Sequence, residues 1–243
     1  MSEAASVVVA NDTSRAHPLD AVIWNALTGR QRGLAVGDER VLRFAADVAP
    51  FGALADTSAA SFEALRTLIA QHGSVALVTA SELAVPSGFS VSRRTTLSQM
   101  VWRGQHEQEA AAPIEYVELE RSDVPDMLAL TAATQPGPFG PRTIELGRYL
   151  GVRKDGKLAA MAGERLKIDG YTEISAVCVN PEFRGQGLAG SLMKQLIAAT
   201  HARGETPFLH VFTTNHTAVA LYRRLGFEQR HEMHLTVLDA AQE

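Results

Sequence analysis

The stretch NPEFRGQGLAG, residues 180–190, decides the fold of this chain of 243 residues. Two phosphate-binding patterns overlap within it. Gly185, Gly187 and Gly190 form G-x-G-x-x-G, which is the pattern of a dinucleotide-binding turn. Residues 184–189 instead form R-G-Q-G-L-A, a different phosphate loop. Both patterns place a diphosphate at the N-terminus of a helix, but they imply different cofactors, so the surrounding sequence has to distinguish them.

The dinucleotide pattern disagrees with its surroundings. A dinucleotide-binding turn is tight and starts directly after a strand, whereas residues 180–184 separate Gly185 from the end of the predicted strand near Val179. That fold also needs a carboxylate at the end of the next strand to hold a ribose hydroxyl, and residues 213–215, Thr-Thr-Asn, carry none. Too few elements follow for a doubly wound sheet. The dinucleotide interpretation therefore fails on three counts, and it stays only as an alternative.

The second pattern agrees with the physics of anion binding. Successive backbone N–H groups from Gly185 to Ala189 can surround an anion and continue into the first turn of a helix. Glycine lets the backbone approach a phosphate closely, and Arg184 adds a positive charge beside the loop. Because a helix end contributes only about 1 kcal/mol per anionic group, several donors have to act together. A diphosphate fits that requirement.

The sequence after residue 113 predicts the order strand, helix, three strands, helix, strand, helix and strand. Asp155-Gly156 and Asp169-Gly170 mark the turns of a three-stranded antiparallel meander within residues 149–180. Apolar residues at helical spacing predict a helix over 187–204. The other elements are expected over residues 114–120, 123–134, 207–214, 216–226 and 227–238.

The first half of the chain carries no catalytic motif. Its pattern predicts a helix over residues 60–73 and strands over 74–80 and 95–102. The segment 103–113 is polar, then rich in alanine, and ends in proline. We therefore expect two domains, residues 1–110 and residues 111–243.

Composition limits the partners and the compartment. With a formal charge of −4 and no block of basic residues, the chain is not expected to bind nucleic acid. Cys178 is the single cysteine, so no intrachain disulfide can form, which favours a reducing compartment. The sequence shows no signal-peptide pattern and no segment typical of a membrane helix. We expect a cytoplasmic protein without membrane association.

Two segments, residues 173–193 and residues 213–227, resemble the GNAT superfamily of acyl-CoA-dependent N-acyltransferases. The family's pyrophosphate loop, R-x-x-G-x-A, matches at Arg184, Gly187 and Ala189. The helix that follows in the family matches at Asn215, Ala218, Leu221-Tyr222 and Leu225-Gly226-Phe227. The resemblance covers residues 114–238. Within the superfamily, the chain is similar to the two-domain type of glycine N-acyltransferase-like proteins. It implies a mixed α/β (α+β) sheet, with a GNAT-type fold in the second half and a degenerate GNAT-like first half.

The resemblance also implies acetyl-CoA, or another acyl-CoA, as the co-substrate. In the family, the strand before the phosphate loop, here residues 173–179, splays from its neighbour and pairs with the pantetheine arm. A main-chain N–H near Val177 would polarise the thioester carbonyl. The residues expected to bind the cofactor are Val177, Cys178, Val179, Arg184, Gly185, Gln186, Gly187, Leu188, Ala189, Asn215 and Tyr222.

Acyl transfer to nitrogen needs a neutral amine. A lysine-like amine, with a pKa of about 10.4, is far harder to deprotonate at neutral pH than an α-amino group, with a pKa of about 7.7–8.0. A carboxylate can take the proton directly or through a water molecule. The resemblance implies Glu173 as this base, with Glu164 as the alternative, and Tyr222 as the acid that protonates the leaving thiolate.

The acceptor is expected to be the primary amine of a small molecule, acetylated directly in a ternary complex. In the family, the loop after the first helix shapes the acceptor pocket, so Phe139 and Arg142 are candidates for contacts with the acceptor. An arginine there would suit a carboxylate-bearing acceptor such as an amino acid. Cys178 is expected to be a core residue rather than a nucleophile. No metal site is expected, because His231 and His234 would point to opposite faces of a strand.

Two questions stay open at this level. The phosphate loop could belong to an acyl-CoA sensor or scaffold without catalytic activity, rather than to an enzyme. Dinucleotide binding stays only as a third possibility, which predicts a thermal shift with NAD and none with acetyl-CoA. The first half could cover the site, pair two subunits as a homodimer, or only stabilise the second half.

Overall fold

The computed structural model describes residues 17–104 and 114–240. In these ranges the chain forms one mixed sheet of 11 strands, in the order β1-β2-β3-β4-β11-β5-β10-β9-β8-β7-β6. The predicted domain boundary near residue 110 lies outside the described ranges. None of the described helices combines the length and the apolar character that crossing a membrane requires.

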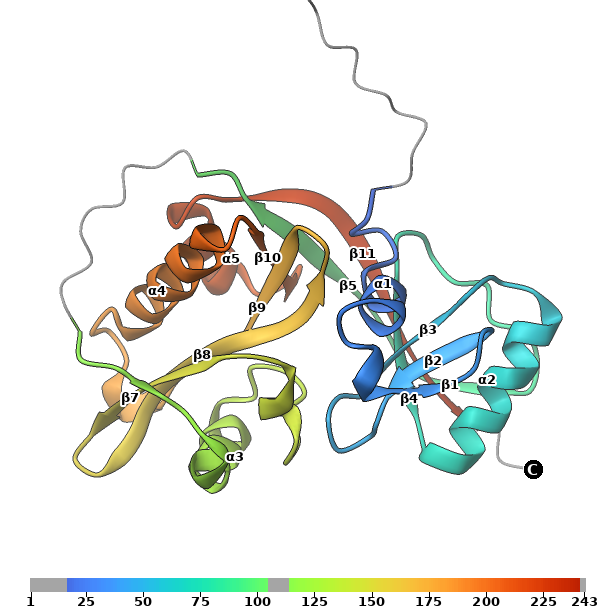
Figure 1. Cartoon of the computed structure of the whole chain (residues 1–243), viewed down its shortest axis with the longest axis horizontal. Coiled ribbons are helices and arrows are strands. Elements are labelled where there is room, and N and C mark those ends of the chain that lie inside the picture. Colours follow the sequence, from blue (N-terminus) through green and yellow to red (C-terminus); the bar gives the residue numbers. More distant parts are fainter. Residues whose placement is uncertain (1–16, 105–113, 241–243) are drawn as a thin grey trace, which may run out of the picture.

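Each half contributes strands to this sheet, and each half also contains helices (Figure 1). The elements of the first half are α1 (Val22–Thr28), β1 (Ala35–Gly37), β2 (Val41–Phe44), β3 (Phe51–Leu54), α2 (Ala59–His72), β4 (Val75–Thr79) and β5 (Phe89–Trp102). Those of the second half are β6 (Val117–Glu118), α3 (Val124–Thr134), β7 (Tyr149–Lys154), β8 (Lys157–Ile168), β9 (Tyr171–Val179), α4 (Leu188–Ala202), β10 (Thr206–Phe212), α5 (His216–Arg224) and β11 (Phe227–Ala240). Short 3₁₀ turns lie at Arg32–Leu34, Arg121–Asp123, Thr143–Leu146 and Pro181–Phe183.

Parallel pairing occurs once in each half of the described sheet. It joins β3 to β4 in the first half and β9 to β10 in the second. A helix connects the two strands of each pair, α2 in the first half and α4 in the second. This repeated order supports the expectation that the first half is a degenerate copy of the second.

Strands β5 and β11 connect the two halves. Each is 14 residues long, and they pair antiparallel from Phe227↔Trp102 to Ala240↔Phe89. β11 also pairs with β4, and β5 also pairs with β10. Figure 1 shows both strands running from one half of the molecule into the other. The last strand of the chain therefore lies between two strands of the first half.

The predicted meander is present as β7, β8 and β9. Its turns lie where the sequence predicts them, and Gly156 and Gly170 have φ angles of 74° and 75°. This left-handed conformation favours glycine because it has no Cβ. The first strand of the second half is shorter than expected, because β6 pairs with only two residues of β7 and its neighbour Tyr116 is exposed.

Helix α4 buries the apolar stripe that its sequence predicts. Leu188, Leu192 and Leu196 are at most 4% exposed, and Met193 and Ile197 are buried beside them. They pack in one cluster with residues of β7, β8, β9 and β10. Because burying one leucine contributes about 1.5–3 kcal/mol, this stripe fixes the N-terminus of α4 beside the sheet.

Candidate active site

Strands β9 and β10 diverge within the sheet. Their parallel pairing ends at Glu173↔Phe208, although β9 continues to Val179 and β10 to Phe212. Beyond that point β9 pairs only with β8, and β10 pairs only with β5. The splayed strand that the resemblance implies is therefore present, and main-chain groups at the end of β9 face an open wedge.

A bulge turns the end of β9. The register between β8 and β9 shifts after Ser175↔Gly163, and Ala176 takes a φ angle of 53°. This left-handed conformation costs a residue with a Cβ about 1–2 kcal/mol. Bulges bend a strand and redirect its groups. Val177 and Val179, which follow the bulge, are half-buried and line a cavity in the wedge.

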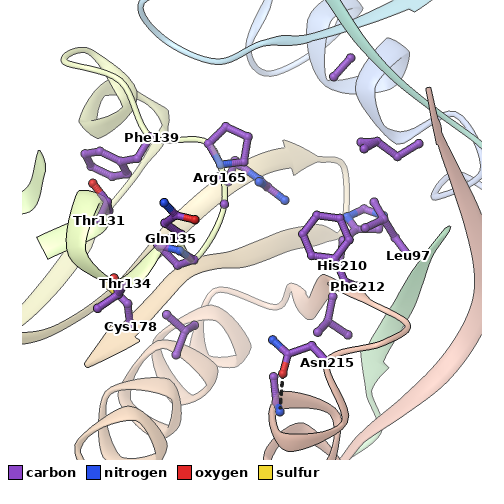
Figure 2. Close-up of a pocket in the computed structure, with 18 of the residues that line it drawn as sticks. Leu97, Thr131, Thr134, Gln135, Phe139, Arg165, Cys178, His210, Phe212 and Asn215 are labelled. Atoms are coloured by element: carbon purple, nitrogen blue, oxygen red, sulfur yellow. Dashed lines mark hydrogen bonds between the residues drawn. The ribbon is translucent and has the colours of Figure 1, made fainter. Parts of the chain in front are cut away.

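The cavity has a volume of about 1360 Å³ and reaches from the wedge to the first half of the chain. Figure 2 shows His210 and Phe212 from β10 and Cys178 from β9 around the same space. Phe51 and Arg93 line it from the first half. Pockets for one small ligand usually measure roughly 300–1,000 Å³, so this cavity is larger than a usual pocket for one small ligand.

The phosphate loop presents unused hydrogen-bond donors. Gly185 and Gly187 have φ angles of 78° and 73°, and a Cβ added at either would meet no atom within 4 Å, so glycine is needed here for backbone conformation rather than for space. Helix α4 starts after Gly187 without a side-chain cap. Within the described ranges, the N–H groups of residues 185–189 donate to no backbone acceptor. The loop therefore fits a diphosphate.

The residues expected in this loop divide into two groups. Three of them line the cavity: Arg184, Gly185 and Ala189. Three do not: Gln186, Gly187 and Leu188. The side chain of Gln186 accepts a hydrogen bond from Lys154 Nζ, and Leu188 is buried in the core. Any cofactor contact of these three residues would use the main chain.

Helix α5 places Asn215 and Tyr222 on the cavity wall. Asn215 Oδ1 accepts a hydrogen bond from the N–H of Ala218 at 3.1 Å and so caps the helix. Burial raises the pKa of Tyr222 to about 12, and the nearby Cys178 adds to this rise. The phenol is therefore protonated at physiological pH and can donate a proton.

Cys178 lines the cavity, but its thiol is a weak nucleophile. Burial raises the pKa of its thiol to about 11, although hydrogen bonds with Thr134 and with the backbone of Met161 act in the opposite direction. Only the thiolate is a strong nucleophile. The structure thus gives Cys178 the properties of a buried core residue.

Glu173 is fully buried and does not line the cavity. Arg165 donates to both of its oxygens, at 2.8 Å and 2.6 Å, and His210 Nδ1 lies 2.7 Å from Oε1. Burial alone would raise the pKa of Glu173, but Arg165 and His210 lower it to about 2. A carboxylate with so low a pKa is a weak base. Its two partners, rather than Glu173 itself, form part of the cavity wall.

The hydrogen bonds around His210 define its tautomer. Gln99 Oε1 accepts from Arg230 Nε at 2.5 Å, so Gln99 Nε2 is the amide donor. That nitrogen lies 3.0 Å from the carbonyl oxygen of Leu19 and 3.0 Å from His210 Nε2. His210 therefore accepts at Nε2 and carries its proton on Nδ1, from which it donates to Glu173.

Glu164, the alternative base, also lies outside the cavity wall. It is 1% exposed, and its oxygens pair with Lys167 and Arg203, each at 2.7 Å. Burial would raise the pKa of Glu164, but these two cations lower it overall. Its carboxylate is therefore already fully engaged.

The two residues expected to contact the acceptor lie in different surroundings. Phe139 lines the cavity and packs edge to face against Tyr149, with ring centroids 5.7 Å apart. Arg142 does not line it. Its guanidinium donates to both oxygens of Glu145, at 3.0 Å and 2.8 Å, and lies 3.4 Å from Asp47. Because two carboxylates already neutralise Arg142, it is poorly placed to bind an acceptor.

Several polar residues on the cavity wall are absent from the sequence-based expectations, among them Arg93, Arg165 and His210. His210 interrupts the apolar run PFLHVF, and Arg165 follows Glu164 inside a strand. A polar side chain in a buried strand is unusual, and this was the available signal. Within the described ranges, no three His, Cys, Asp or Glu side chains are grouped to hold a metal ion.

Known proteins match part of this chain. The family model described as FR47-like protein matches residues 149–235. The chain is 32% identical over 117 residues to [Ribosomal protein bS18]-alanine N-acetyltransferase of Escherichia coli (strain K12), a match that covers 46% of this chain and 78% of that protein. It is 37% identical over 87 residues to N-alpha-acetyltransferase RimI of Mycobacterium tuberculosis, covering 33% of this chain and 52% of that protein.

Solved structures match over both halves. A GNAT-family structure from Novosphingobium aromaticivorans DSM 12444 has a TM-score of 0.80 and 38% identity, and the match covers 93% of this chain and 100% of the other. A GCN5-related N-acetyltransferase from Kribbella flavida shares the fold, with a TM-score of 0.57 at 18% identity, over 89% of this chain and 95% of the other.

The fold of these solved structures agrees with the mixed sheet described above. The comparisons also decide between the enzyme and the sensor, because the named relatives are acetyltransferases. The chain belongs to the GNAT superfamily and is an acyl-CoA-dependent N-acetyltransferase.

Proposed function

We propose that this enzyme transfers the acetyl group of acetyl-CoA directly to the primary amine of a small molecule while both substrates are bound. One observation carries the proposal. A single cavity of about 1360 Å³ runs from the phosphate loop, through the wedge between β9 and β10, to side chains of the first half. Both substrates can therefore meet without leaving the protein.

Acetyl-CoA fits the end of the cavity that the second half forms. The free N–H groups of residues 185–189 and the charge of Arg184 suit a diphosphate. The open edge of β9 at Val177 and Val179 suits the amides of the pantetheine arm, which would pair with it as an added strand does. In this arrangement the N–H of Val177 stabilises negative charge on the thioester oxygen.

His210 takes the proton of the amine in this proposal. The other titratable groups on the wall are arginines, Cys178 and Tyr222, all of which keep their protons at neutral pH. His210 accepts the proton at Nε2 after Gln99 releases its hydrogen bond to that nitrogen. Glu173 then stabilises the imidazolium through Nδ1, so we assign Glu173 a positioning role.

In this proposal the acetyl group passes directly to the amine, because both the Cys178 thiol and the Tyr222 phenol are protonated. The neutral amine attacks the carbonyl carbon, and the carbon–sulfur bond breaks as the C–N bond forms. Tyr222, which is protonated at physiological pH, supplies a proton to the leaving thiolate. The thiol of Cys178 is also protonated, so it does not form an acyl-enzyme.

The first half of the chain supports a small acceptor. Phe51, Ala76 and Arg93 belong to it and line the same cavity as Tyr222. The acceptor end is therefore walled by side chains of this chain. The relative from Escherichia coli is named for acetylating alanine of ribosomal protein bS18, so the α-amine of a protein is the second candidate acceptor. That match leaves more than half of this chain without a counterpart.

Separate assays with each kind of acceptor distinguish the two candidates. The enzyme is incubated with acetyl-CoA and either a panel of small primary amines or a peptide that begins with the alanine of bS18, and free CoA thiol is followed. Turnover of small amines with no turnover of the peptide supports the proposal. Turnover of the peptide alone would overturn the small-molecule assignment, and absence of all transfer would overturn the proposed function.

A further inference from the structure

The charged side chains on the cavity wall are all positive. Arginines line it at four positions, Arg93, Arg165, Arg184 and Arg224, and no aspartate or glutamate of the described ranges does. Arg184 lies on the phosphate loop, which we propose to hold acetyl-CoA, and Arg224 lies on α5, which carries the proposed proton donor Tyr222. Arg93 lies on β5 and Arg165 on β8. Binding of the cofactor does not account for these two.

Arg93 and Arg165 differ in their counter-charge. Arg165 pairs with Glu173, which neutralises it. The guanidinium of Arg93 lies 4.8 Å from the centroid of the Phe212 ring. Within the described ranges no carboxylate forms an ion pair with Arg93. Because an aromatic ring orients a cation without neutralising it, Arg93 places an uncompensated positive charge on the wall.

Arg93 stands at one end of a row that crosses the sheet of the first half. It pairs with Val237 of β11, Val237 pairs with Ala76 of β4, and Ala76 pairs with Phe51 of β3. Paired residues share one face of a sheet, and all four line the cavity. At the far end, the guanidinium of Arg165 lies 4.8 Å from the centroid of the Phe51 ring. The row forms an apolar floor between two cations.

We propose that the acceptor is an amino carboxylate with an apolar body, and that Arg93 binds its carboxylate. The inference rests on the proposed function and specifies its acceptor. A guanidinium matches a carboxylate with two parallel hydrogen bonds. The apolar body lies on Val237, Ala76 and Phe51, and the amine reaches His210 and the thioester. Arg93 thus takes the role that the sequence assigned to Arg142.

The test compares amino carboxylates with their own amides. Leucine, phenylalanine and 6-aminohexanoate are each assayed beside the matching amide, with wild type, R93Q and R94Q. The amine of an α-amino amide is easier to deprotonate than that of the acid, so a preference for the acid cannot come from amine basicity. Arg94 is the matched control, because it neighbours Arg93 in sequence, pairs with Glu82 and does not line the cavity.

We expect wild type and R94Q to prefer at least one acid over its amide in kcat/KM by at least about 10-fold. R93Q should reduce that ratio by about 10- to 100-fold, because a hydrogen bond to a charged group is lost. Equal use of acids and amides by wild type, or a ratio unchanged in R93Q, would overturn the inference while leaving the proposed function intact.

A binding measurement covers the case in which no small amine is acetylated, which would overturn the proposed function. Thermal unfolding is then followed with CoA and each acid or amide. Stabilisation by an acid that its amide does not give, and that R93Q loses, supports the carboxylate site at Arg93. Absence of that difference overturns it.

Discussion

Glu173 holds a buried negative charge between Arg165 and His210. Removing the charge leaves Arg165 buried without a partner, which typically costs about 3–5 kcal/mol. We predict that E173Q lowers the free energy of unfolding by about 3 kcal/mol at pH 7 in urea denaturation. E182Q is the control, since it removes an exposed carboxylate paired with Lys157 and should change stability by less than about 1 kcal/mol.

The same variant should lose its disadvantage in acid. The pKa of Glu173 in the folded protein is about 2, below its ordinary value of 4.5. A depressed pKa contributes stability that is complete above the unfolded pKa and is lost as pH falls toward the folded pKa. The difference in unfolding free energy between wild type and E173Q should therefore shrink from about pH 5 toward pH 2. A difference that stays constant over that range contradicts the ion pair.

Replacing His210 should change how kcat/KM depends on pH. We predict that H210Q lowers kcat/KM by about 100-fold at pH 7, the low end for loss of a general base. The deficit should narrow as pH rises, because the acceptor amine then loses its proton without help. The measurement is kcat/KM for one small amine across pH 6–10.

Y222F provides the contrasting profile. Its loss should be smaller, about 10-fold in kcat, because a thiolate is already a good leaving group. Because burial raises the pKa of Tyr222 to about 12, the wild-type phenol stays protonated over the whole assay range, and the deficit of Y222F should not narrow with pH. If H210Q and Y222F gave parallel profiles, His210 would not be the base.

At the level of single elements, local sequence rules predict most of the second half. The glycines of the phosphate loop, the apolar stripe of α4 and the Asp-Gly turns of the meander are each set by residues within a few positions of one another. The cluster at Glu173 is different. Its partners Arg165 and His210 come from β8 and β10, so they meet only through strand pairing. Arg142 shows the same limit, because one of its carboxylates, Asp47, lies 95 residues earlier.

The phosphate loop permits a test that separates backbone strain from ligand binding. Gly187 and Gly170 have φ angles of 73° and 75°, and an added Cβ meets no atom at either. G187A and G170A should therefore each lower the free energy of unfolding by about 1–2 kcal/mol. Only G187A should also weaken acetyl-CoA binding, because Gly187 belongs to the loop whose N–H groups bind the diphosphate in our proposal and Gly170 does not. Calorimetric titration measures both affinities, and equal affinities would remove the loop from the binding site.

For the whole molecule, the sequence marks a boundary that the sheet crosses. Composition changes in segment 103–113, and we expected two domains on that basis. Strand β11 nevertheless pairs with β4, whose residues lie more than 150 positions earlier. No local pattern carries such a pairing, because period-two alternation fixes the face of a strand and not its neighbours. The cavity follows the same arrangement, since β4 and β11 line it together.

A shared sheet predicts that the two halves unfold together. Trp24 in α1 packs against a core cluster to which both halves contribute, whereas Trp102 packs near His201 of α4 and donates from its indole N–H to the carbonyl oxygen of Leu225 at 2.9 Å. W102F therefore leaves a reporter in α1, and W24F leaves a reporter in β5 that contacts the second half. In both variants, the urea midpoint from fluorescence should coincide with the midpoint from far-ultraviolet circular dichroism.

The physical reason lies in β11. Unfolding of the first half alone would remove β4 from one side of this strand and β5 from the other, which would expose Leu235 and Leu238, now at most 8% exposed. The second half would also lose the part of the cavity wall that the first half supplies. A midpoint for Trp24 well below that of the circular dichroism signal would instead mean that the first half unfolds as a separate domain.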